Sequence, residues 1–131
     1  MKRLRIGSSF WLVGALSMSL ILPGCSTIEE VREKPALLEF RTSASAKDVA
    51  ECIRDGWQAI SVLGGPLGGD MQSSGARYTV VAPNVEQPWH VVDVMPTAKG
   101  TQVSYHFKNT WQSPLERIVQ VVRSCEHPAA P

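Results

Sequence analysis

The chain has 131 residues, 44% of them hydrophobic, with 13 basic and 12 acidic side chains and a formal net charge of +1. This length is enough for one domain with a single modest core. The near balance of charges, without a basic stripe, argues against a nucleic-acid-binding protein.

The first 24 residues have the pattern of a secretory signal peptide. Residues 1–5 carry three basic side chains and no acid, and residues 6–24 are uncharged and mainly apolar. The alternative is a transmembrane helix, which needs about 20 strongly apolar residues. This segment is diluted by glycines and serines and ends in Leu22-Pro23-Gly24-Cys25. A basic head, an apolar core and a small residue before the cleavage point favour the signal peptide.

Leu22-Pro23-Gly24-Cys25 resembles the lipobox of bacterial lipoproteins, in which the cysteine becomes the lipidated first residue. The resemblance implies cleavage after residue 24, acylation of Cys25 and firm membrane attachment through three acyl chains. Because Ser26 follows, and not the aspartate that favours the inner membrane, it implies the outer membrane and a periplasm-facing domain. Residues 25–35 would be the lipidated N-terminus and a charged tether, 36–127 a single α+β domain, and 128–131 a tail.

Cleavage at this point would change the charge of the chain. It removes Lys2, Arg3 and Arg5, so that ten basic residues face twelve acidic ones and the formal charge becomes −2. The mildly acidic mature chain again argues against nucleic acid as a partner.

With Cys25 assigned to lipid, two cysteines remain, Cys52 and Cys125. An even number of cysteines in the oxidising periplasm predicts a disulfide. A catalytic cysteine is the alternative, but neither cysteine has a histidine-centred motif around it and the compartment favours pairing. We therefore predict that Cys52 and Cys125 are linked.

The first half of the mature chain predicts a strand followed by a helix. Residues 36–42 alternate as a strand does, with Leu38 and Phe40 two positions apart. Ser45-Ala46-Lys47-Asp48 is a helix-capping pattern. The helix that follows places on one face Val49, Cys52, Ile53, Gly56, Trp57 and Ile60.

Residues 64–75 contain five of the ten glycines and predict a mobile loop. A phosphate-binding loop is the alternative, but the stretch has no Gly-Lys-Ser/Thr and no Gly-x-Gly-x-x-Gly that opens a helix. We expect a flexible connection that contacts a partner through Leu67 and Met71.

The second half is rich in predicted strands, at 76–82, 89–95 and 101–107. The last of these alternates cleanly, with Val103, Tyr105 and Phe107 inward. Ser113-Pro114-Leu115-Glu116 predicts the start of the last helix, with Ser113 as its cap. The apolar stripe of that helix consists of Leu115, Ile118, Val119, Val122 and Cys125.

The order strand–helix–strand–strand–strand–helix predicts an α+β two-layer sandwich. We expect an antiparallel sheet of about four strands with two helices on one face. Cys52 and Cys125 would then meet on neighbouring helices. In element order alone, the domain is similar to the helix-grip type domains of some outer-membrane assembly lipoproteins and to small uncharacterised proteobacterial outer-membrane lipoproteins.

Candidate catalytic groups are few. His90 and His106 lie on neighbouring predicted strands, but a zinc site needs at least one more ligand, so we expect surface histidines and no metal. The carboxylates are scattered, and neither a paired acid/base site nor a nucleophile elbow is visible. No cofactor motif is present, and we expect no cofactor.

The tryptophans bear on partners. Trp57 is expected in the core, whereas Trp89 and Trp111 flank strands, where an exposed aromatic side chain marks an interface or packs at the rim. We therefore expect a non-enzymatic binding or accessory role in the cell envelope, through the membrane lipid on Cys25 and an envelope protein partner. The alternatives are a small envelope hydrolase and a capture module for a small ligand.

Overall fold

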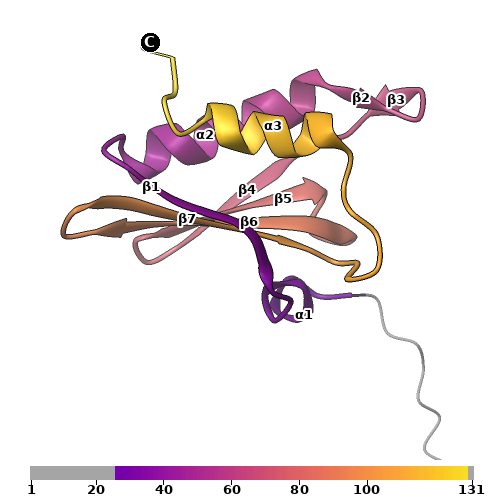
Figure 1. Cartoon of the computed structure of the whole chain (residues 1–131), viewed down its shortest axis with the longest axis horizontal. Coiled ribbons are helices and arrows are strands. Elements are labelled where there is room, and N and C mark those ends of the chain that lie inside the picture. Colours follow the sequence, from indigo (N-terminus) through magenta and orange to yellow (C-terminus); the bar gives the residue numbers. More distant parts are fainter. Residues whose placement is uncertain (1–25, 130–131) are drawn as a thin grey trace, which may run out of the picture.

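The computed structural model describes residues 26–129, so the predicted signal peptide and Cys25 lie outside the described part of the chain. The described residues form two sheets and three helices (Figure 1). The elements are α1 (Ile28–Arg32), β1 (Ala36–Thr42), α2 (Ala46–Ala59), β2 (Ser61–Val62), β3 (Gly65–Pro66), β4 (Asp70–Ser74), β5 (Arg77–Pro83), β6 (Pro88–Thr97), β7 (Gly100–Phe107) and α3 (Glu116–Ser124).

The larger sheet has five antiparallel strands in the order β1-β7-β6-β5-β4, and β2 pairs with β3 in a separate small hairpin. The α+β class and the antiparallel sheet are as predicted, but the sheet has five strands where about four were expected. The difference is β4, which occupies part of the glycine-rich stretch that we expected to be a mobile loop. Asp70–Ser74 pairs along its whole length with β5.

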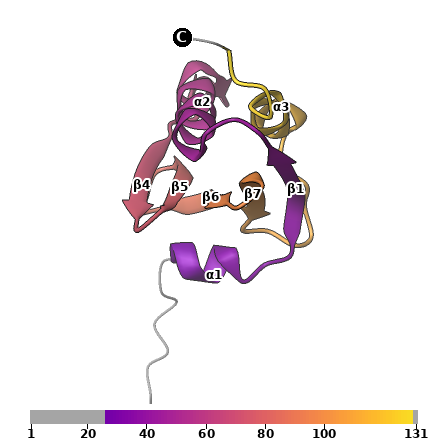
Figure 2. The same ribbon diagram turned by 90° about the vertical axis from the view of Figure 1, so that its left-hand side faces the viewer.

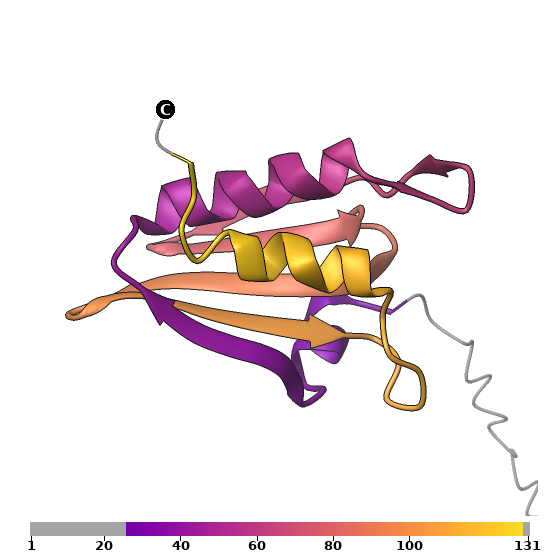
Figure 3. The same cartoon turned by 45° about the horizontal axis from the view of Figure 1, so that its top comes forward.

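Helices α2 and α3 lie side by side on one face of the sheet, and α1 lies on the other (Figures 2 and 3). Ser45 caps α2 as predicted, because its side-chain oxygen accepts the backbone N–H of Asp48 at 3.1 Å. The cap predicted for the last helix is wrong. Helix α3 begins at Glu116, its N-cap is Leu115, and no side chain caps it.

The main core fills the space between the two helices and the sheet. Trp57 is fully buried there, as predicted, and its indole N–H donates to the backbone carbonyl of Ile118 on α3 at 3.1 Å. Gly56 allows the two helices to approach closely, since a Cβ at this position would lie 2.5 Å from Val121 Cγ1. The largest side chains with no exposure around Trp57 are Tyr105, Ile53, Val49, Val80, Val92, Val94, Val103 and Val122.

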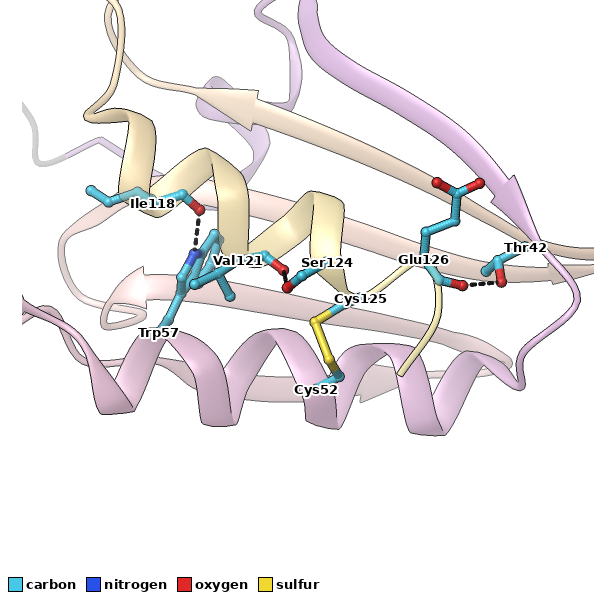
Figure 4. The surroundings of a disulfide bond; sticks show 8 residues. All are labelled: Thr42, Cys52, Trp57, Ile118, Val121, Ser124, Cys125 and Glu126. Atoms are coloured by element: carbon cyan, nitrogen blue, oxygen red, sulfur yellow. Dashed lines mark hydrogen bonds between the residues drawn. A yellow bond between two sulfur atoms is a disulfide. The ribbon is translucent and has the colours of Figure 1, made fainter. Parts of the chain in front are cut away.

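The disulfide joins these two helices. Cys52 and Cys125 are bonded, with 5.8 Å between their Cα atoms, and the bond ties the middle of α2 to the end of α3 (Figure 4). The predicted pairing is thus present in the structure. It fixes the two helices next to each other over the sheet.

The predicted tether contains a folded element. Helix α1 packs on the second face of the sheet, where Val31 is 1% exposed and contacts Val81 and Val91. Arg32 adds a two-point hydrogen bond to Asp93, with Nε donating to Oδ2 at 2.6 Å and Nη2 donating to Oδ1 at 2.8 Å. Residues 28–32 of the predicted charged tether therefore belong to the folded domain.

Candidate functional site

The two histidines that could seed a catalytic or metal site are on opposite faces of the sheet. His90 is 4% exposed and lies on the helix-covered face, so the prediction of a surface histidine is wrong for this residue. His106 is partly exposed and its Nδ1–H donates to the backbone carbonyl of Lys34 at 2.7 Å on the other face. Among residues 26–129, no group of three metal-ligating side chains gathers at one place.

His90 is held among aromatic side chains. Its Nδ1 shares a hydrogen bond of 2.7 Å with the hydroxyl of Tyr105, and its ring stacks on Phe107 with 4.8 Å between centroids. Burial lowers the pKa of His90 to about 4 and raises the pKa of Tyr105. Because a general base at neutral pH works best with a pKa near 7 and access to its substrate, this neutral, enclosed imidazole is suited to packing more than to catalysis.

The residues predicted to contact a partner divide into two groups. Leu67 is buried in the main core, with only its edge reaching a groove described below, and Met71 on β4 packs partly buried against the same core. Trp89 at the start of β6 is 44% exposed, and Trp111 in the loop after β7 is 80% exposed. The structure therefore retains the two tryptophans as candidate contacts.

An apolar groove opens at the end of the molecule where Trp89 lies. Its volume is about 370 Å³, and it is formed by the β2–β3 hairpin, the start of β6, the end of β7 and the start of α3. We call it the end groove. Its apolar lining consists of Val62, Leu63, Leu67, Pro83, Trp89, Phe107, Pro114, Leu115 and Ile118.

Leu63 stands at the rim of the end groove and was missed by the sequence prediction. Residues 63 and 64 form the tip of the β2–β3 hairpin, and both have a positive φ, 53° for Leu63 and 82° for Gly64. Glycine adopts this conformation readily, but for a leucine it is strained. The Leu63 side chain is nevertheless fully exposed, at 101%. The only sequence signal was the two-residue spacing between Val62 and Gly65, which is typical of a tight hairpin.

Leu115 is the second exposed aliphatic side chain at this groove. It was predicted in the buried stripe of the last helix, but α3 begins one residue later and Leu115 is 47% exposed. The prediction of a buried Leu115 is therefore wrong. Leu115 is exposed because α3, and with it the helical periodicity, begins only at residue 116.

Further hollows adjoin the end groove. One of about 230 Å³ is lined by Trp111, Leu37 and Phe107, and Phe107 also lines the end groove. Another, of about 270 Å³, is lined by Ser26, Trp89 and Lys108. The Lys108 ammonium lies 5.3 Å from the centre of the Trp89 ring, a cation–π arrangement. Ser26, the first described residue, thus lies beside the end groove.

We call this region the apolar end and define it by its exposed large apolar side chains: Leu37, Leu63, Trp89, Trp111 and Leu115. The other end of the sandwich differs in character. There, a hollow of about 300 Å³ is lined by polar and small apolar groups in about equal measure, the polar ones including Thr42, Asp48, Glu126 and His127. Five of the seven exposed large apolar side chains among residues 26–129 thus lie at the apolar end, whereas Met95 lies near the far end of β6.

This arrangement suits the binding of apolar material.

The chain matches no family model, no curated protein and no solved structure. Within residues 26–129, no helix is both long and apolar enough to cross a membrane.

Proposed function

We propose that the mature chain is a lipid-anchored, periplasm-facing protein of the outer membrane that acts by binding and not by catalysis. The observation that carries the binding role is the apolar end, where the exposed side chains of Leu63, Trp89 and Leu115 border a groove of about 370 Å³. The anchoring role rests on the lipobox-like Leu22-Pro23-Gly24-Cys25.

A second candidate function is the capture of a small apolar ligand in the same groove. Its volume lies within the range of small-molecule sites, and its lining is mostly apolar with a few polar groups. The space between the helices and the sheet has no room for such a ligand, because Trp57 and its neighbours fill it. The end groove is therefore the place that this alternative has to use.

The hydrolase alternative has less support. His90 borders the end groove, but its hydrogen bond to Tyr105 and its stacking on Phe107 occupy its ring. A working base would need to move out of this packing to reach a substrate. A His90→Phe variant that folds and keeps its role in cells would remove the remaining basis for this alternative.

The anchoring half of the proposal is tested at Cys25. Cys25→Ala should abolish metabolic labelling with a fatty-acid analogue and release the protein from the membrane fraction. A variant that is still labelled, or that fractionates as the wild type does, would contradict the anchor.

The binding half is tested by photocrosslinking in intact cells. A photoreactive residue in place of Leu63 should give crosslinks to envelope material, whereas one in place of Met95 should not. Met95 is also exposed, but it lies near the far end of β6. Equal crosslinking at both positions, or none at either, would count against the apolar end as the binding surface.

A further inference from the structure

The connection between the predicted lipid and the folded domain is very short. Thr27 is the N-cap of α1: its side-chain oxygen accepts the backbone N–H of Glu30, and its own backbone N–H donates to the Glu30 carboxylate. Folded structure therefore begins at Thr27, two residues after Cys25. An acylated Cys25 is bonded directly to Ser26, and the Cα atoms of consecutive residues are about 3.8 Å apart.

Helix α1 is also fixed to the sheet. Val31 is buried against Val81 and Val91, and Arg32 is hydrogen-bonded to both carboxylate oxygens of Asp93. A lipid on Cys25 would thus be joined to the domain through a docked helix and not through a loose linker. The end of the domain that carries Ser26 has to face the membrane.

That end is the apolar end. Ser26 and Trp89 line one hollow, and Trp89 in turn lines the end groove. Trp side chains are enriched at the membrane–water interface, where an apolar body with a polar N–H is well placed. Lys108, over the Trp89 ring, can extend its ammonium to the lipid headgroups while its stem stays in apolar surroundings.

We propose that the apolar end lies against the lipid bilayer, with Leu63, Trp89, Trp111 and Leu115 in the interface between headgroups and acyl chains. This proposal rests on the acylation of Cys25 proposed above. It explains why a leucine is kept fully exposed at a strained hairpin tip, because that side chain is exposed to water only when the domain is away from the bilayer.

The charge of the mature chain is consistent with apolar contact as the attractive force. Its formal charge of −2 gives no general attraction to anionic lipids. The anchor keeps the domain at a high effective concentration next to the bilayer. A modest apolar surface is therefore sufficient to hold the domain in one orientation. A lipid surface fits better than a single small ligand because Trp111 and Leu37 border a hollow separate from the end groove.

The test uses the acylated protein in vesicles of phosphatidylethanolamine and phosphatidylglycerol whose acyl chains are brominated. Bromine quenches tryptophan fluorescence only at short range. The mature chain has three tryptophans, of which Trp57 is buried. Trp111→Phe then reports Trp89, Trp89→Phe reports Trp111, and the double variant keeps Trp57 alone. We expect quenching in both single variants and its loss in the double variant.

A reporter at the opposite end is the matched control. Met95→Trp in the double-Phe background places a tryptophan six residues along β6 from position 89, roughly 20 Å away. This reporter should stay unquenched. Equal quenching at position 95 and at position 89, or no quenching of Trp89 and Trp111 in anchored protein, would overturn the proposal. Trp89 that responds to an added fatty acid but not to brominated vesicles would overturn it in favour of a small ligand.

Failure of the anchor has a different signature. If Cys25 is not acylated, mass spectrometry of the purified protein shows no lipid and the protein does not co-float with the vesicles. Protein that co-floats but is not quenched keeps the anchor and contradicts only the orientation.

Discussion

The two faces of the five-stranded sheet are covered in different ways. On one face, α2 and α3, of 14 and 9 residues, enclose the main core and are joined by the Cys52–Cys125 disulfide. On the other, the five-residue α1 buries only Val31 among its own residues and is held by Arg32 and Asp93.

The two faces therefore have different roles, one in the stability of the domain and the other in the position of its N-terminus. Isolated helices shorter than about 12 residues are marginal in water, so α1 depends on its contacts with the sheet. A partly buried ion pair contributes little net stability, because desolvation offsets much of the attraction. It does, however, fix where two groups meet. The helix-covered face therefore supplies the folding energy, and α1 sets where the chain leaves the domain.

The largest expected effect is on the helix-covered face. The double variant Cys52→Ala/Cys125→Ala removes a crosslink between residues 73 positions apart. The chain-entropy estimate for a loop of this size is about 4 kcal/mol. Urea unfolding followed by circular dichroism should show this loss, and the wild type under strong reductant should match the variant. A loss below about 1 kcal/mol would mean that the core alone holds α3 in place.

The pH dependence of stability should also come from this face. Burial lowers the pKa of His90 to about 4, against about 6.5 in the unfolded chain. Between these values the unfolded state binds more protons, so this stability is complete above about pH 6.5 and is lost as the pH falls towards 4. The full loss is about 3 kcal/mol.

His90→Phe is the variant that measures this contribution. As the pH falls from 7 to 4, the wild type should lose unfolding free energy relative to the variant, because the variant lacks the titrating ring. Tyr105→Phe is the matched control: it removes the hydroxyl next to His90 but keeps the ring buried, so its pH dependence should follow the wild type. Parallel profiles for the wild type and His90→Phe would refute the assignment.

The helix-covered face was largely predictable from the sequence. The 3.6-residue periodicity placed Ile53 and Trp57 inward, and the period-2 alternation of β7 placed Val103, Tyr105 and Phe107 inward. These patterns are strong because one side of each element is wet. The disulfide followed from the count of cysteines once Cys25 was set aside.

The second face and the end groove were not predicted. A signal for α1 was present, because Val80, Val81 and Ala82 are consecutive apolar residues that a strand with one wet face would not have. The sequence contains a weaker signal for the end groove. It is assembled from loops and element ends, such as Leu63 and Leu115, whose exposure depends on tertiary packing and not on periodicity.

The smallest expected effect is on the α1 face. Asp93→Asn removes the carboxylate that Arg32 pairs with and that raises the pKa of that arginine through its hydrogen bond. Because this change leaves the Arg32 guanidinium partly buried without its charged partner, we expect α1 to be loosened by about 1–2 kcal/mol, or roughly tenfold faster hydrogen exchange at residues 31–34, with little change in global unfolding. Asp55→Asn, which removes an exposed carboxylate paired with its neighbour Arg54, is the control and should leave this exchange unchanged.

The outcome at Asp93 also bears on the orientation at the bilayer. If α1 fixes the domain to its anchor, loosening it lengthens the connection and should reduce quenching of Trp89 by brominated lipid. Quenching that persists in Asp93→Asn while α1 exchanges faster would mean that the apolar end holds itself on the membrane without the helix. Unchanged hydrogen exchange in α1 would contradict the claim that Arg32 and Asp93 hold the helix on the sheet, because Val31 alone would then be enough to dock it.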